Sequence, residues 1–162
     1  MEIIHKQGSI TDATEYYILH QVNCQGVMGF GVAKAIRDKW PKVYEDYKDY
    51  YGKIKQCYPN YGLLGQVCLS VVENHCVFNA FGQEYYGKEH KRYTSYDAVY
   101  DYLKYVRNTI LSNHEGPQEL ALPYKMASDR GGADWDVITA MIISVFKDTN
   151  IKISIYHYEQ VS

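Results

Sequence analysis

Short apolar runs of strand length recur along the chain and alternate with segments of helical periodicity. The runs are residues 16–22, 66–72, 75–81, 120–122 and 151–158. Each is bounded by polar or turn-forming residues, which is typical of buried strands. The dipeptide Glu73-Asn74 joins the second run to the third and predicts a tight connection between two strands. The chain therefore carries several short strands rather than one long apolar segment.

Three segments between these runs have apolar residues every third or fourth position, as one buried helix face requires. The first has Val32, Ala33, Ile36, Trp40, Val43, Tyr44, Tyr47 and Tyr51, the second Tyr96, Val99, Tyr100, Leu103, Val106, Ile110 and Leu111, and the third Trp135, Ile138, Met141, Ile142, Val145 and Phe146. Pro41 predicts a break in the first helix near Trp40, because the residue before a proline avoids the α region. Thr94 or Ser95 is expected to cap the second helix, and Asp134 the third.

Strands that alternate with crossover helices predict a three-layer α/β/α fold with a mixed, largely parallel central sheet. No repeat, linker or low-complexity tract divides the sequence, so we expect a single domain over residues 1–162. In open sheets of this type, ligands bind outside the carboxyl ends of the strands. Those ends are where functional residues are expected.

Charge and composition narrow the function classes. The 17 basic and 19 acidic residues give a formal net charge of -2, which does not favour general nucleic-acid binding. No apolar run approaches the ~18 residues of a membrane span, and no signal peptide is expected at the start of the chain. The four cysteines form no C-x-x-C pair, so we expect a reduced, cytoplasmic protein with no metal site. The 18 tyrosines are unusual and indicate a core that relies partly on Tyr, whose hydroxyl needs a partner when buried.

Two loops rich in small residues each follow a strand and precede a helix. The first contains Gly26-x-x-Gly29-x-Gly31, and the second spans residues 127–133. The first loop is neither the dinucleotide fingerprint nor a P-loop, because the glycine spacing differs and no G-K-[ST] follows. One such loop alone is explained equally well as a tight packing turn. Two of them favour an anion held between backbone N–H groups on both sides, as a diphosphate requires.

These segments resemble macro domains. Residues 19–33 (LHQVNCQGVMGFGVA) are similar to the first ligand loop of that family. Leu122-Pro123-Tyr124-Lys125 and Gly131-Gly132-Ala133-Asp134-Trp135 resemble its second loop and the following helix, and Ile153-Ser154-Ile155-Tyr156 resembles its closing strand. The resemblance covers essentially the whole chain. It is strongest to the branch that holds terminal ADP-ribose glycohydrolases and the yeast-type ADP-ribose-1″-phosphate phosphatase.

The resemblance implies an ADP-ribose site that needs no cofactor. Asn23 is expected to bind the distal ribose. The diphosphate is expected between Met28, Gly29, Phe30, Gly31 and Val32 on one side and Ser128, Arg130, Gly131 and Gly132 on the other. Adenine is expected near Ser9 and Ile10, where Ser9 replaces the usual aspartate of a Gly-Asp-Ile run, and stacked on Tyr156 or Tyr158.

His20 and Asp129 are the candidate catalytic residues. His20 either is a structural strand histidine or acts as a general acid or base; the phosphatase-like relatives carry a similar His-x-x-Asn arrangement, which favours catalysis. Asp129 either activates a water at the distal ribose or shapes the loop as an Asx turn. The glycohydrolase relatives pair an acid in this loop with a lysine near Phe81, where this sequence reads Gly82-Gln83. A lysine adduct is therefore not expected.

Further residues are expected at the rim of the site. A mostly basic cluster, residues 88–92 (KEHKR), would attract a phosphorylated ligand if it is more than a solvated charge run. Tyr85 and Tyr86 are expected beside it. Two functions follow: a hydrolase of an ADP-ribose derivative, or a module that binds ADP-ribose without turnover. The expected partner is ADP-ribose or a derivative, including an ADP-ribosylated macromolecule, and no membrane.

Overall fold

The computed structural model of the chain describes residues 1–58, 62–87, 89 and 91–158. Within these residues, six strands form one sheet in the order β1-β6-β5-β2-β4-β3. They are β1 (Glu2–Gln7), β2 (Tyr17–Asn23), β3 (Val67–Val72), β4 (His75–Gln83), β5 (Glu119–Pro123) and β6 (Lys152–His157). Every neighbouring pair is parallel except β3 and β4, which are antiparallel. The expected mixed, largely parallel sheet is confirmed.

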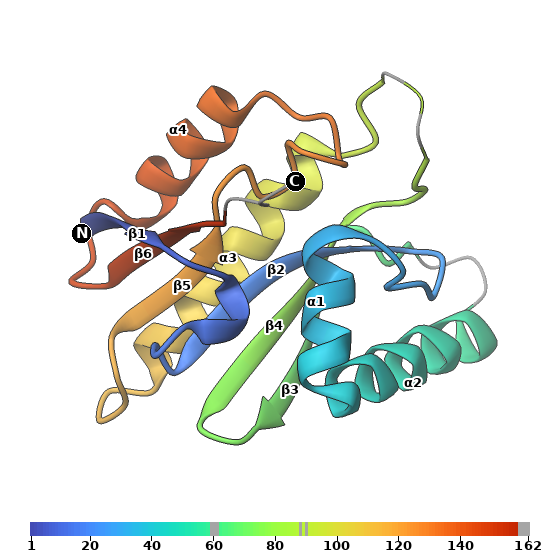
Figure 1. Ribbon diagram of the computed structural model, residues 1–162, viewed down its shortest axis with the longest axis horizontal. Coiled ribbons are helices and arrows are strands. Elements are labelled where there is room, and N and C mark those ends of the chain that lie inside the picture. Colours follow the sequence, from blue (N-terminus) through green and yellow to red (C-terminus); the bar gives the residue numbers. More distant parts are fainter. Residues whose placement is uncertain (59–61, 88, 90, 159–162) are drawn as a thin grey trace.

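The helices cover both faces of this sheet (Figure 1). They are α1 (Gly31–Lys39), α2 (Pro41–Cys57), α3 (Tyr96–Ser112) and α4 (Trp135–Phe146), with a short 3-10 turn, η1 (Ile10–Asp12), after β1. Residues of α3 and α4 pack with one face of the strands, and residues of η1, α1 and α2 pack with the other. The three-layer α/β/α architecture is therefore confirmed.

Helix boundaries fall where the local chemistry predicts them. The long periodic segment divides at Trp40, because Pro41 is the first residue of α2. Of the two candidate caps of α3, Ser95 is the one used, and its hydroxyl accepts a hydrogen bond from the Ala98 amide at 3.2 Å. Asp134 caps α4 through the amide of Asp136.

Some tyrosines are buried and others exposed, and their helical spacing predicts which ones only in part. Tyr47 and Tyr102 are completely buried, whereas Tyr100 is 42% exposed. Tyr102 was not among the expected core positions of α3; it takes the place that the spacing gives to Tyr100. Val32, in the first turn of α1, is also exposed rather than buried.

The cysteines and the lengths of the helices can be compared with the expectations. Cys24, Cys57, Cys68 and Cys76 are all free thiols, and Cys68 and Cys76 are buried as small apolar residues. No helix in the described part of the chain is both long and apolar enough to cross a membrane.

Candidate functional site

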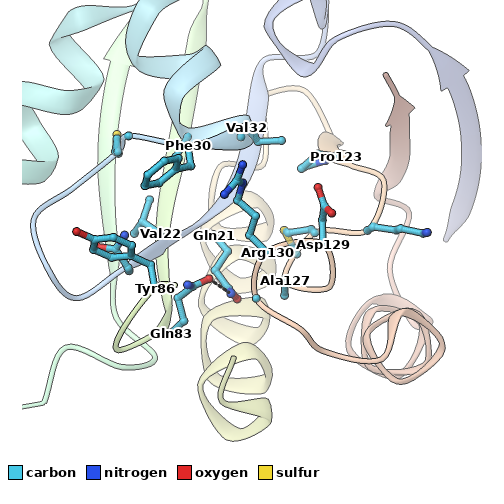
Figure 2. Close-up of a pocket in the computed structure, with 18 of the residues that line it drawn as sticks. Gln21, Val22, Phe30, Val32, Gln83, Tyr86, Pro123, Ala127, Asp129 and Arg130 are labelled. Atoms are coloured by element: carbon cyan, nitrogen blue, oxygen red, sulfur yellow. Dashed lines mark hydrogen bonds between the residues drawn. The ribbon is translucent and has the colours of Figure 1, made fainter. Parts of the chain in front are cut away.

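A pocket of about 220 Å³ lies at the carboxyl ends of β2, β4 and β5. It opens between the first loop, residues 24–30 before α1, and the second loop, residues 124–134 before α4 (Figure 2). Its walls are formed by residues 21–23, 27–33, 83, 86–87, 123–127 and 129–131. Both small-residue loops therefore contribute to one site, at the sheet edge where a parallel fold places ligands.

The start of α1 forms one side of the pocket. Phe30 occupies the cap position but provides no side-chain bond, and the first turn holds no acidic residue. The amides of Gly31, Val32 and Ala33 therefore have no partner within the helix. Gly31 has a φ of +58°, a conformation that favours glycine. This helix start is suited to an anion.

Arg130 extends from the second loop toward the first (Figure 2). Its guanidinium carbon lies 4.9 Å from the centre of the Phe30 ring, which is within cation–π range. The Phe30 ring in turn lies 6.0 Å from the ring of Tyr86. The arginine thus places a positive charge between the two loops, next to the start of α1.

Amide side chains form the floor of the pocket. The Gln21 amide nitrogen donates to Thr94 Oγ1 at 2.8 Å and to Gln83 Oε1 at 3.1 Å, and the Tyr102 hydroxyl donates to Gln21 Oε1 at 2.9 Å. A Cβ on Gly82 would lie 1.9 Å from Gln21 Oε1, so glycine is what makes room for this side chain. Sequence reasoning did not single out Gln21; the available signal was a polar residue inside an otherwise apolar strand run.

Asn23 lines the pocket as expected, but its side chain also holds the first loop in shape. Its Nδ2 donates to the Val27 carbonyl at 2.9 Å, and its Oδ1 accepts from the Gln25 amide at 3.0 Å. Met28, Gly29, Phe30, Gly31 and Val32 line the pocket with it. Their position fits a ligand loop, and their role in binding stays a prediction.

The second loop lines the pocket only in part, unlike the prediction from the sequence. Asp129, Arg130 and Gly131 line the pocket, whereas Ser128 and Gly132 do not. A Cβ on Gly132 would lie 2.3 Å from the Lys91 carbonyl oxygen, and the φ of Gly132 is +72°. The Gly131 carbonyl accepts hydrogen bonds from the amides of Tyr93 and Thr94. The Gly131-Gly132 pair thus allows the segment before α3 to approach closely, which corrects the expectation that both glycines cradle the diphosphate.

His20 does not reach the pocket. It is fully buried, and its Nε2 lies 2.5 Å from Asn79 Oδ1, while its Nδ1 has no partner among the described residues. Burial lowers its pKa to about 4. Strand alternation explains the placement: His20 shares its face of β2 with Ile18 and Val22, toward α1 and α2. This corrects the expectation that His20 is catalytic.

The residues expected around adenine also lie outside the pocket walls. Ser9 caps η1 by accepting from the Thr11 amide, and Ile10 is buried. Tyr158 is 66% exposed just after β6. None of the three lines the pocket.

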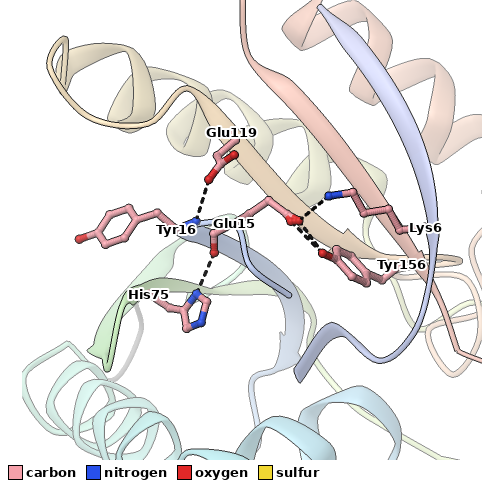
Figure 3. A network of polar contacts seen from close by, with 6 residues as sticks. All are labelled: Lys6, Glu15, Tyr16, His75, Glu119 and Tyr156. Carbon is pink, nitrogen blue, oxygen red and sulfur yellow. Dashed lines mark hydrogen bonds and ion pairs between the residues drawn. The ribbon is translucent and has the colours of Figure 1, made fainter. Parts of the chain in front are cut away.

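Tyr156 belongs to a buried polar network instead (Figure 3). Its hydroxyl lies 2.5 and 2.8 Å from the two carboxylate oxygens of Glu15, and Lys6 Nζ lies 3.2 Å from one of them. Burial, followed by the bond to Glu15, raises the pKa of Tyr156 to about 12. This placement corrects the expectation that Tyr156 stacks on adenine. Tyr124 does line the pocket, and its ring stacks on the His157 ring with the two centroids 4.0 Å apart.

None of the described residues of the expected basic cluster lines the pocket. Lys88 and His90 lie outside the described residues, and Glu89, Lys91 and Arg92 are exposed and do not line the pocket. Tyr86 lines the pocket, whereas Tyr85 does not. The residues that the structure describes include no group of three or more His, Cys, Asp or Glu side chains able to hold a metal ion.

Comparison with known proteins identifies the fold. No family model matches the sequence, and no curated protein does. A Bacteroides thetaiotaomicron protein of unknown function is 26% identical over 97% of this chain and 98% of its own, with a TM-score of 0.82. The macrodomain of Thermus aquaticus DarG is 18% identical over 98% of both chains, with a TM-score of 0.75. Thermosipho africanus DarTG, solved in complex with ADP-ribose, is 17% identical over 98% of this chain and 43% of its own, with a TM-score of 0.73. The chain therefore has the macrodomain fold.

Proposed function

We propose that this chain binds ADP-ribose or an ADP-ribose derivative in the pocket between its two loops. The observation that carries the proposal is the pairing of the uncapped start of α1 with the Arg130 side chain across the same pocket. Free helix amides and a guanidinium are complementary to a diphosphate. A similar fold, that of Thermosipho africanus DarTG, has been solved with ADP-ribose.

The pocket is small for a ligand of the size of ADP-ribose. About 220 Å³ is below the roughly 300–1,000 Å³ typical of pockets that hold a drug-sized ligand. We therefore expect the pocket as it stands to take only part of the ligand, the diphosphate and one sugar, with the remainder toward Tyr124. Arg130, exposed and held mainly by its contact with Phe30, is the side chain expected to move as the ligand enters.

Hydrolysis of the bound derivative is the second candidate function. Asp129 is the only carboxylate among the described residues that line the pocket, and it is the remaining candidate to activate a water. In Figure 2, however, Asp129 lies on the Pro123 side of Arg130, while Gln83 and Tyr86 lie on the other side. Asn23 ends β2, which lies between β5 and β4 in the sheet order and lines the same pocket as Asp129. Asp129 is therefore the residue to test for turnover.

Titration calorimetry with ADP-ribose tests the binding proposal. A dissociation constant in the micromolar range, about -8 kcal/mol, is expected. Gly31→Glu should abolish binding, because the new carboxylate projects toward Arg130 and the diphosphate space. Gly52→Glu is the matched control, since Gly52 is exposed with open space around it. Wild-type protein that gives no heat with millimolar ADP-ribose would overturn the proposal.

Turnover separates the two candidate functions. The protein is incubated with ADP-ribose-1″-phosphate and with a mono-ADP-ribosylated protein, and release of phosphate and of ADP-ribose is followed. A hydrolase that uses Asp129 should lose about 100-fold in rate in Asp129→Asn while retaining its affinity for ADP-ribose. Binding without release of either product identifies a binding module.

A further inference from the structure

The tyrosines of α2 support the first loop from the side opposite the pocket. Tyr44 donates to the Gly26 carbonyl at 3.4 Å, and the Tyr51 ring lies 3.1 Å from the place where a Cβ on Gly26 would be. Gly26 itself has a φ of +75°. The turn at Gly26 is thus fixed by its own backbone conformation and by aromatic residues of α2.

Tyr47 makes the most extensive contacts of this group. It is fully buried, and its hydroxyl accepts a hydrogen bond from the Gly26 amide at 3.1 Å. The same hydroxyl lies 2.6 Å from the Asn23 carbonyl oxygen and 2.9 Å from Asn23 Oδ1. Its single proton satisfies one of these two acceptors at a time. One hydroxyl group therefore links the end of β2 to the turn of the loop.

These contacts act on a residue of the pocket. Asn23 Oδ1 faces the Tyr47 hydroxyl and the Gln25 amide, which turns Asn23 Nδ2 toward the Val27 carbonyl. Val27 and the residues after it line the pocket as far as the start of α1. The orientation of the Asn23 amide and the path of the loop are consequently set together by Tyr47.

We propose that Tyr47 is a positioning residue of the ligand site, although it does not line the pocket: its hydroxyl holds Asn23 and the turn at Gly26 in the geometry that binds ADP-ribose. This rests on the proposed function. Burial raises the pKa of the Tyr47 hydroxyl above its ordinary value of 10.0, so the hydroxyl is protonated at neutral pH. A loop held in its binding geometry before the ligand arrives loses less conformational entropy on binding.

The test compares Tyr47→Phe with Tyr17→Phe. Tyr17 is also a buried tyrosine whose hydroxyl bonds an asparagine, Asn113, but it lies at the other end of β2 from the pocket. Each variant is assayed for ADP-ribose affinity by calorimetry, for thermal midpoint, and for hydrogen exchange at the Gly26 amide by NMR. Tyr47→Phe should weaken binding about tenfold and speed Gly26 exchange, because the amide loses its acceptor. Tyr17→Phe should lower the thermal midpoint while leaving affinity and Gly26 exchange unchanged.

The outcomes separate this inference from the proposed function. If wild-type protein binds ADP-ribose and Tyr47→Phe binds it equally well with unchanged Gly26 exchange, Tyr47 is only a core residue. If wild-type protein does not bind ADP-ribose, the proposed function fails, and Gly26 exchange still decides whether Tyr47 sets the loop. Tyr44→Phe removes a weaker bond to the same glycine from a half-buried position, and it should weaken binding about twofold without unfolding the chain.

Discussion

At the scale of single residues, Gly82 shows how a missing side chain shapes the pocket floor. The pairing of β2 with β4 is irregular at this point, because Val22 pairs with Phe81 and Asn23 with Gln83. The Gln21 side chain occupies the space beside Gly82 and bonds Gln83, Thr94 and Tyr102 from there. A glycine at this position is therefore required for space rather than for an unusual φ.

Gly82→Ala should lower the free energy of unfolding by about 2 kcal/mol, since the new methyl group displaces Gln21 from its three partners. Urea unfolding followed by circular dichroism measures the loss. Gly52→Ala is the control: Gly52 lies exposed within α2 with open space around it, so the same change should stabilise by about 0.5–1 kcal/mol. Equal effects of the two substitutions would contradict the steric explanation.

The sequence predicted some of the residues that line the pocket and missed others, and each outcome has a physical reason. Glycine spacing and strand position predicted a ligand loop after β2, and Asn23 and residues 27–32 do line the pocket. The His-x-x-Asn resemblance favoured a catalytic His20, but period-two alternation within β2 directs this residue to the covered face of the sheet. Gln21 was missed, because its role depends on Thr94, a residue distant in sequence. Local sequence patterns are enough to predict the loops, whereas the floor of the pocket depends on contacts between residues that are far apart in the sequence.

At the scale of elements, the boundaries were predictable wherever one residue changes the backbone hydrogen bonding. Pro41 ends α1, and Ser95 and Asp134 begin α3 and α4. One edge strand was harder to predict. β1 was not evident from periodicity, because its half-exposed residues do not form an apolar run.

Ser95→Ala should lower the free energy of unfolding by about 1 kcal/mol, because it removes the hydroxyl that accepts from the Ala98 amide at the start of α3. Ser112→Ala is the same substitution at the last residue of that helix. There the exposed hydroxyl only donates to the Thr109 carbonyl, and a change within about 0.5 kcal/mol is expected. Thermal unfolding of both variants checks the difference, which should vanish if the cap contributes nothing.

At the scale of the whole molecule, the core includes ionisable groups that water does not reach. His20 and Glu15 are both buried, on the sheet face that α1, α2 and η1 cover. Glu15 is compensated by Lys6 and Tyr156, whereas His20 bonds only Asn79 among the residues that the structure describes. Folding therefore requires His20 to stay neutral, and this links the stability of the whole domain to pH.

Stability should fall as the pH is lowered from about 6.5 toward 4. The ordinary pKa of His20 is 6.5 and burial lowers it to about 4, so within this window the unfolded chain binds a proton that the folded chain does not. The effect of this one residue reaches about 3 kcal/mol at the acid end of the window. Denaturant unfolding at several pH values should give a shallower pH dependence for His20→Gln than for wild-type protein. Parallel curves would show that His20 becomes protonated without penalty.

The pairing of β1 with β6 has a consequence for the order of events during synthesis. Residues 2–7 are synthesised long before residues 152–157, yet within the described strands β1 pairs with β6 alone. Until the last of those residues emerges, the nascent chain carries an unpaired first strand and an uncovered edge on β5, both of which can pair with other chains. Completion of the sheet therefore waits until residues 152–157 have been synthesised, and a chain that stalls before Lys152 is expected to need a chaperone to remain unaggregated.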